Sequence, residues 1–442
     1  MRRVSSLAAL AAFLVYPGAA RPAPIDATAR HDAVEALAAG VSDVYVFADI
    51  GKQYADSLRA RLAGGAYDAI ADDAALADRL TTDLQAIHPD KHLRVLTATD
   101  PRGERFRPPG SRAGAPPGDP RASMLARERT VNFGFARVEI LPGNVGLVDL
   151  RSFDPAEIAG ETAVAAMRFL GNCDAVIFDL RKNGGGSPTM IQLLVSYLVG
   201  EDPEHINDFY IREGDETRQF HTLPYVPGTR LKDADVFVLT SRRTFSAAEE
   251  FTYDLQALKR GTVVGDTTGG GAHPVRPVPL AGGLIATVPF GRAINPVTGK
   301  DWEGTGVIPD LPCAADDALD VAHAEALRRL AEHAKDDARK TELAWALDDV
   351  NARLKPPSLE PRTLEQLTGS YGARAVALER GRLWLRPEVG PMLELSPLGK
   401  DVFAAMGAPS PLRVTFVRAK GGRASELVLT SPSGEIGRFA RS

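Results

Sequence analysis

The first hundred residues carry apolar side chains at helical spacing. One stripe recurs at intervals of three and four residues through Leu76, Leu80, Leu84 and Ile87. This spacing places the four side chains on one face of a helix. Alanine-rich segments at 34–39 and 54–62 predict two more helices. We therefore expect a helical domain over residues 21–100.

The pattern changes between residues 126 and 340, where short β-rich apolar runs alternate with helical stretches. The predicted strands are 145–150, 175–180, 236–240 and 262–264, and the predicted helices are 161–170, 189–199 and 247–258. Such alternation indicates an α/β core with a largely parallel sheet. In these sheets, ligands bind at the loops beyond the carboxyl ends of the strands. The glycines at 184–186 and Ser246 occupy such loops.

The last eighty residues alternate apolar and polar positions with the period of a β-strand. Several short runs of this kind predict a small C-terminal antiparallel β module at 363–442, with Leu412, Val414 and Phe416 on one face. A charged helical stretch from 315 to about 354 precedes it, and prolines mark a linker at 341–362. A second linker, at 101–125, is rich in proline and glycine.

Composition and charge narrow the classes of function. The chain of 442 residues is 44% apolar and 25% charged, with a net charge of −5 and no basic block, so we expect no nucleic-acid partner. Its two cysteines are Cys173 and Cys313, and no CxxC or Cys/His cluster is present. We therefore expect neither a metal nor a cofactor. A disulfide between the two cysteines, and the oligomeric state, stay open.

The N-terminus has the three parts of a secretory signal. Arg2 and Arg3 precede an apolar run at 7–15, and small residues follow. The run is too short to span a bilayer. We expect residues 1–20 to form a signal peptide cleaved near Ala20, which gives a periplasmic or secreted protein with no stable membrane span. An uncleaved membrane anchor is the alternative.

Ser246 follows a predicted buried strand and opens a predicted helix. The N-terminus of a helix has free backbone N–H groups and the positive end of the helix dipole. These features favour an alkoxide-like nucleophile, and they allow the N–H of Ala247 to bind a developing oxyanion. A serine that merely caps the helix is the alternative.

Three successive glycines, Gly184, Gly185 and Gly186, follow another buried strand. Glycine permits unusual backbone angles and the close approach of a substrate. The N–H group of Gly184 or Gly185 can therefore complete an oxyanion hole. No Lys-Ser/Thr follows the glycines, which excludes a P-loop. A tight turn without a role in chemistry is the alternative.

Two further polar residues are candidates for proton chemistry. His92 ends the helical domain in the segment Asp90-Lys91-His92-Leu93, where it is either a general base or a core residue. Glu303 lies between Trp302 and a glycine in a segment rich in turns. Its carboxylate either orients an imidazole or is a solvated loop acid.

These segments together resemble one family. The stretches FDLRKNGGG, TSRRTFSAAEEF, VVGDTTGGGAHP and WEGTGVIPD occur in the order and approximate spacing of the tail-specific (C-terminal processing) serine peptidases. The resemblance is to the branch related to interphotoreceptor retinoid-binding protein and the tricorn protease core. It covers about residues 30–335, and it implies a crotonase-like core with Ser246 as the nucleophile.

The resemblance implies one of two general bases. Processing proteases use a lysine about 25 residues after the serine, but here that position is Gly271. The tricorn-like branch uses an upstream histidine and a later glutamate, and His92 and Glu303 match those positions. Lys91 stands where the tricorn core has a serine. His273 lies 27 residues after Ser246 and is the alternative base or a substrate contact.

The expected function is that of an exported serine endopeptidase acting on a peptide or protein. The interval 97–133 is too short for the PDZ domain of the processing proteases. The segment that begins LTGSYGARAVALERGRLWLRP resembles lipocalin-like modules of exported serine hydrolases. A non-catalytic binder of apolar ligands, such as a retinoid or fatty acid, and an esterase are the alternatives. All three matched catalytic positions are filled, which favours the enzyme.

Overall fold

The computed structural model describes residues 23–97, 100, 120–420 and 422–442. Two compact units divide the chain. The first takes the N-terminal segment up to Pro120 together with 209–217 and 273–292, and the second takes the remainder. The expected signal peptide and residues 101–119 of the expected linker lie outside the described residues. The rest of that linker begins a helix, α5 (Pro120–Thr130).

The first unit begins with three helices, α1 (Ala27–Val44), α2 (Ala48–Ala63) and α3 (Asp73–Gln85). Aspartates cap two of them, because Asp26 accepts the N–H of Ala29 and Asp72 accepts that of Ala75, both at 2.8 Å. The predicted stripe is buried through Leu76, Leu80 and Leu84, whereas Ile87 lies beyond the end of α3. The three predicted helices are confirmed.

A small antiparallel sheet with the order β1-β10-β9 completes the first unit. Its strands are β1 (Arg94–Leu96), β9 (Val275–Pro279) and β10 (Ile285–Pro289), and Arg94 pairs with Thr287. Ala286 and Val288 of β10 pack in the same core as the helices. The N-terminal helical part therefore contains strands from much later in the sequence.

The second unit contains a six-stranded sheet with the order β12-β8-β7-β4-β3-β2. Its strands are β2 (Phe135–Leu141), β3 (Val145–Leu150), β4 (Ala175–Asp179), β7 (Asp235–Thr240), β8 (Thr262–Gly265) and β12 (Leu311–Pro312). All neighbours are parallel except β2 and β3. The four strands predicted in this region are confirmed, as is their parallel arrangement.

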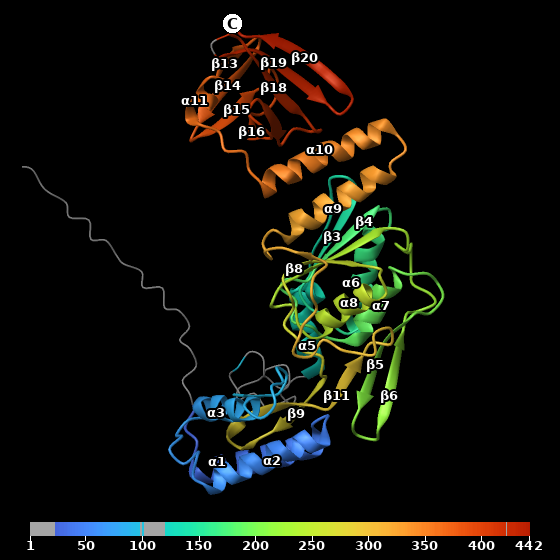
Figure 1. The fold of residues 1–442 in the computed structure, drawn as a ribbon, viewed down its shortest axis with the longest axis vertical. Helices are drawn as coiled ribbons and strands as arrows, with labels where there is room; N and C mark the ends of the chain where they lie inside the picture. Colours follow the sequence, from blue (N-terminus) through green and yellow to red (C-terminus); the bar gives the residue numbers. More distant parts are fainter. Residues whose placement is uncertain (1–22, 98–99, 101–119, 421) are drawn as a thin grey trace, which may run out of the picture. The chain divides into compact units, whose positions relative to one another are not determined.

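Helices cover both faces of this sheet (Figure 1). Val176 and Phe178 of β4 pack in a core with α6 (Ala156–Phe169), α7 (Pro188–Ser196) and α8 (Ala247–Ala257). Ala175 and Ile177 face the other way, toward α9 (Ala318–His333) and α10 (Asp337–Leu354). Successive side chains of a strand point to opposite faces, so an unbroken apolar strand serves both layers.

The single helix expected over 315–354 is two helices, which corrects that prediction. α9 ends at His333, and α10 begins after Asp336. The carboxylate of Asp336 accepts the N–H groups of Ala338 and Arg339 at 3.3 and 3.2 Å. This side-chain cap starts a new helix where charge composition alone suggested continuity.

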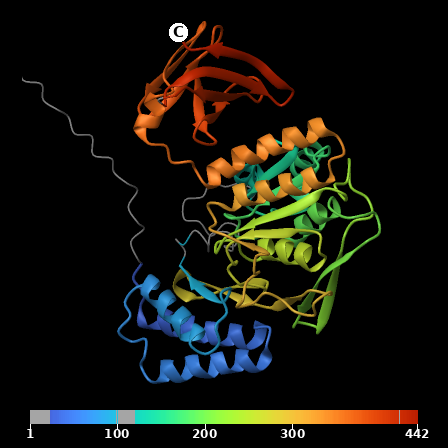
Figure 2. The ribbon, with the colours of Figure 1, turned by 45° about the horizontal axis from the view of Figure 1, so that its top comes forward.

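The C-terminal residues form an eight-stranded antiparallel sheet whose strands follow one another in sequence order, coloured orange to red in Figure 2. A short helix, α11 (Pro361–Glu365), precedes it. The strands are β13 (Gly369–Tyr371), β14 (Arg374–Glu379), β15 (Arg382–Arg386), β16 (Leu393–Pro397), β17 (Val402–Met406), β18 (Arg413–Arg418), β19 (Ala424–Ser431) and β20 (Gly434–Ala440). Val414 and Phe416 are buried in its core, as the alternation indicates.

Three remaining strands, β5 (His205–Ile211), β6 (Glu216–His221) and β11 (Gly291–Ile294), form a sheet with the order β11-β5-β6. Single 3-10 turns occur at Asn132–Gly134 and Ala281–Gly283. Among the described residues, no helix is both long and apolar enough to cross a membrane. Cys173 and Cys313 are free thiols, and burial raises the pKa of both.

Candidate active site

Ser246 occupies a strained turn between strand β7 and helix α8. The strand ends at Thr240 and the helix begins at Ala247, so the chain reverses within six residues. Ser246 has φ 56° and ψ −124°, a conformation that L-residues rarely adopt and that costs on the order of 1–3 kcal/mol. Its side chain is half-buried. A serine on a strained strand-to-helix turn presents its hydroxyl away from the backbone, as nucleophilic serines do.

The carboxylate of Glu249, one turn into the helix, lies against the Ser246 turn. Its Oε2 accepts the N–H of Ser246 at 2.8 Å. The same carboxylate accepts three more donors, which are Thr268 Oγ1 at 2.5 Å, Gly270 N at 2.6 Å and Gly271 N at 2.9 Å. Burial raises the pKa of Glu249, and the four donors act in the opposite direction. Glu249 therefore joins the serine turn to the segment 268–271.

The glycine loop lies directly against Ser246. Gly185 has φ +106°, and a Cβ at this position would lie 2.8 Å from the Cβ of Ser246 and 2.9 Å from the carbonyl oxygen of Phe245. Real Cβ atoms do not approach other atoms this closely, so the position requires glycine. The structure thus brings together two of the segments that the sequence predicted to form one site.

Of the three predicted oxyanion donors, which stay a prediction, one already has an acceptor. The N–H of Gly185 donates to Oδ1 of the buried Asn183 at 2.8 Å, so it is already occupied. The predicted donors that remain are Gly184 and Ala247. Ala247 is the first residue of α8, where N–H groups have no acceptor within the helix. Space is open at Gly184, because a Cβ there would meet no atom of the described residues within 4 Å.

Glu303 contacts the backbone of the segment that follows Gly271. Its Oε2 accepts the N–H of Ala272 at 2.5 Å. The neighbouring Trp302 is buried and donates its indole N–H to the carbonyl oxygen of Gly271 at 2.8 Å. These two bonds hold the Trp302–Gly304 turn against the glycine-rich segment. The predicted orienting acid therefore holds a main-chain N–H in this structure.

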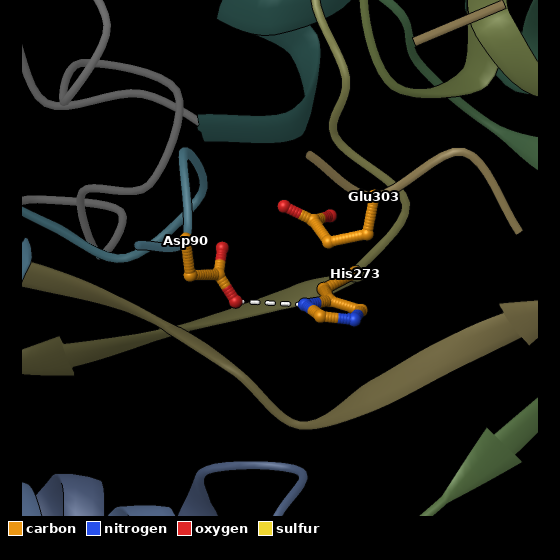
Figure 3. A group of neighbouring side chains, drawn as sticks. All are labelled: Asp90, His273 and Glu303. Atoms are coloured by element: carbon orange, nitrogen blue, oxygen red, sulfur yellow. Dashed lines mark hydrogen bonds and ion pairs between the residues drawn. The ribbon is translucent and has the colours of Figure 1, made fainter. Parts of the chain in front are cut away.

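The two candidate histidines belong to the first unit. His273 Nδ1 lies 2.7 Å from Oδ2 of Asp90 (Figure 3), and both side chains are buried, with exposed fractions of 3% and 1%. Tyr45 donates its hydroxyl to the same oxygen at 3.0 Å. Burial acts to raise the pKa of Asp90, but the hydrogen bonds and charges of His273 and His92 together outweigh it and leave this pKa below its ordinary value.

His92 is held by its backbone beside this pair. Its N–H donates to Oδ1 of Asp90 at 2.9 Å, and its carbonyl oxygen accepts the hydroxyl of Thr287 at 2.6 Å. The side chain is half-buried. Because Ser246 and Glu303 belong to the second unit, the pairing of His92 with them stays a prediction.

Three residues that sequence reasoning missed contribute to this arrangement. Glu249 stands three residues after Ser246 in an S-x-x-E pattern, which is a signal for a carboxylate that folds back over the helix start. Asn183 stands two residues before Gly185, the spacing of an Asx turn. Asp90 had no local signal, because its partner His273 is 183 residues away.

Comparison with known families gives two matches. A model of Peptidase family S41 matches residues 144–313, and a model of the N-terminal domain of Peptidase S41 in eukaryotic IRBP matches residues 27–142. The carboxy-terminal processing protease CtpB of Bacillus subtilis (strain 168) is 29% identical over 142 residues. That alignment covers 32% of this chain and 28% of the Bacillus protein, so less than a third of that relative is matched.

Two solved protease structures match this chain at low sequence identity. The photosystem II D1 C-terminal processing protease is 16% identical, with a TM-score of 0.41, over 65% of this chain and 94% of that one. The tricorn protease is 14% identical, with a TM-score of 0.42, over 69% of this chain and 37% of that one. Since both TM-scores lie below 0.5, neither likeness bears on activity.

Proposed function

The chain belongs to peptidase family S41, and from that premise we propose that it is an exported serine peptidase that cleaves peptide bonds through an acyl-enzyme on Ser246. The observation that carries this proposal is the backbone of Ser246. A strained conformation persists only where the surroundings enforce it, and such conformations gather at functional sites. A serine that only caps a helix has ordinary extended angles and needs no such support.

The acylation step assigns a role to each part of the serine turn. The Oγ of Ser246 attacks the carbonyl carbon, and a general base takes its proton. The tetrahedral intermediate places its oxyanion near the N–H groups of Ala247 and Gly184. Collapse of the intermediate expels the amine, which receives the proton, and water then hydrolyses the acyl-enzyme.

We assign the base to His92, with Glu303 as the acid that stabilises its protonated form. The family resemblance supports this choice, and so does exposure. His92 is half-buried, whereas His273 is 3% exposed and its Nδ1 already pairs with Asp90. The buried ring of His273 is less accessible to a substrate than that of His92. A carboxylate on Nδ1 is also how a catalytic imidazole is oriented, so His273 stays the alternative base.

The proposal extends to fold and location. The six-stranded sheet with helices on both faces is assigned as a crotonase-like core, and the eight-stranded sheet as a lipocalin-like module. Residues 1–20 are assigned as a signal peptide removed near Ala20, which places the mature protein in the periplasm or outside the cell. The mass of the mature protein purified from its native host tests the cleavage site.

A fluorophosphonate probe tests the assignment of the nucleophile. The probe is expected to label the wild type on the tryptic peptide that contains Ser246, and not to label Ser246→Ala. That variant keeps the backbone N–H that bonds to Glu249 and is therefore expected to fold. The control is Ser433→Ala, which removes an exposed hydroxyl from a turn of the C-terminal sheet and should label like the wild type.

Other outcomes of the same experiment separate the alternatives. Labelling of Ser246→Ala at the wild-type rate would remove this residue from the mechanism. A wild type that resists the probe but binds retinol or oleate saturably would be a non-catalytic binder. Cleavage of a nitrophenyl ester without cleavage of labelled casein would indicate an esterase.

A further inference from the structure

Glu249 is the most heavily hydrogen-bonded acid near Ser246, and no step of the proposed mechanism uses it. Its side chain is fully buried at the third position of helix α8. An ionised carboxylate offers about four acceptor sites. The donors that occupy them are the N–H of Ser246, the hydroxyl of Thr268 and the N–H groups of Gly270 and Gly271. The acceptor capacity of Glu249 is therefore filled.

Resting on the proposed function, we propose that Glu249 is a positioning residue that holds the nucleophile turn and the 268–271 segment in one reactive geometry. It acts through Ser246 rather than on the substrate. In the positive-φ conformation of Ser246, its N–H donates to Oε2 of Glu249 at 2.8 Å. Losing this bond frees the turn to relax toward ordinary backbone angles, and the Oγ then moves away from its line of attack.

The segment 268–271 lies on the other side of the Glu249 carboxylate. Gly270 has φ +79°, and a Cβ there would lie 3.0 Å from the N atom of Gly306, so this backbone is closely packed. Glu249 binds two successive N–H groups of this segment, while its Oε2 also binds Ser246. One rigid carboxylate therefore sets the spacing between the two chain segments. No neutral side chain reproduces this arrangement.

Glutamine shows why the charge matters. Its amide offers one acceptor oxygen, and it adds two N–H donors. The four groups that bond to Glu249 are all donors. The amide nitrogen of Glu249→Gln would therefore face N–H or O–H groups. At least two of the four donors would lose their acceptor. Aspartate keeps the charge but is one methylene shorter, so Glu249→Asp should keep some bonds and lose others.

The test measures how fast a fluorophosphonate phosphonylates Ser246 at 10 °C in folded protein, over a series of probe concentrations. Displacement of a reacting group by about 1 Å costs about 10²-fold in rate. Glu249→Gln should therefore lower the limiting rate by about 10²-fold and leave the half-saturating probe concentration within about threefold of wild type. Glu249→Asp should fall between the two. Glu332→Gln, at an exposed position of α9, is the matched control and should equal the wild type.

Each outcome decides the proposal. A wild-type limiting rate in folded Glu249→Gln overturns it, as does a change confined to the half-saturating concentration. If Glu249→Gln does not fold, the comparison rests on Glu249→Asp, and a wild-type rate there overturns the proposal. If neither variant folds, Glu249 is a structural residue and the positioning role is rejected. A wild type that resists the probe instead refutes the proposed function, which separates the two failures.

Discussion

Replacing Glu250 with glutamine should protect the protein from destabilisation at alkaline pH. Glu250 is 4% exposed in helix α8, and its Oε1 accepts Nδ2 of the buried Asn207 at 3.0 Å. Asp254 lies one turn later, fully buried, and accepts Nδ2 of Asn295 at 3.0 Å. Burial raises the pKa of Glu250 to about 8, and burial together with the charge of Glu250 raises that of Asp254 well above its ordinary value.

The size of the effect follows from the Glu250 pKa. A rise from 4.5 to about 8 is about 3.5 pH units, and each unit corresponds to about 1.4 kcal/mol. The folded state holds this proton more tightly than the unfolded state does. The contribution of Glu250 to the free energy of unfolding is therefore fully present below pH 4.5 and is lost as the pH rises to about 8. The full loss is about 5 kcal/mol, of which about 4 kcal/mol falls above pH 5.

Urea unfolding between pH 5 and pH 9 measures this loss. Glu250→Gln keeps an oxygen acceptor for Asn207, and its amide N–H replaces the O–H of the protonated acid. Its free energy of unfolding should match wild type at pH 5 and exceed it by about 4 kcal/mol at pH 9. Glu332→Gln, in which an exposed glutamate is replaced, should follow the wild-type curve throughout.

Parallel pH curves for wild type and Glu250→Gln would refute the reasoning, because they would mean that Glu250 binds its proton equally in the folded and unfolded states. A smaller loss in Glu250→Gln that continues above pH 8 would assign the remainder to Asp254. The two carboxyls interact, so their protons belong to the pair rather than to either residue.

Two further predictions use probe labelling of Ser246. His92→Ala should slow labelling by about 10²–10⁴-fold, as expected for loss of a general base. His273→Ala should mainly lower the thermal unfolding midpoint. The reverse result would transfer the base role to His273. Gly185→Ala should abolish labelling. Gly390→Ala is the control and should label normally, because Gly390 has a similar φ of +109° but no described atom lies within 4 Å of the added Cβ. Equal labelling of these two variants would mean that the glycine loop does not shape the site.

The sheet of the second unit could be predicted because its signal is local. β4 and β7 contain the continuous apolar runs AVIF and VFVL, as a strand with helices on both faces requires. The position of Ser246 at a strand-to-helix turn followed from the same pattern. The split of the charged stretch into α9 and α10 did not follow, because Asp336 is one acid among many and its capping role depends on the backbone around it.

Pairings between distant segments could not be predicted from periodicity. Strand β9 contains two prolines, at 277 and 279, and such a sequence predicts a loop rather than a strand. It forms an edge of its sheet, where the missing N–H groups are tolerated. The bond between Asp90 and His273 likewise joins the segments before β1 and β9, which both pair with β10. The bond from the Gly185 N–H to Asn183 has a different cause, because only the backbone geometry shows it.

The segment 270–273 shows how a glycine-rich stretch is kept ordered beside a proposed active site. Ordering one residue costs about 1–2 kcal/mol of conformational entropy, and glycine costs more than other residues. Each residue here is held by an acid from elsewhere in the chain: Glu249 binds the N–H groups of Gly270 and Gly271, Glu303 binds that of Ala272, and Asp90 binds the ring of His273. A hydrogen bond to a charged group contributes about 1.5–3 kcal/mol. Each bond offsets the ordering cost of its own residue, and all four residues are buried. The acids therefore add to the packing of this segment, and loss of any one acid should loosen it locally.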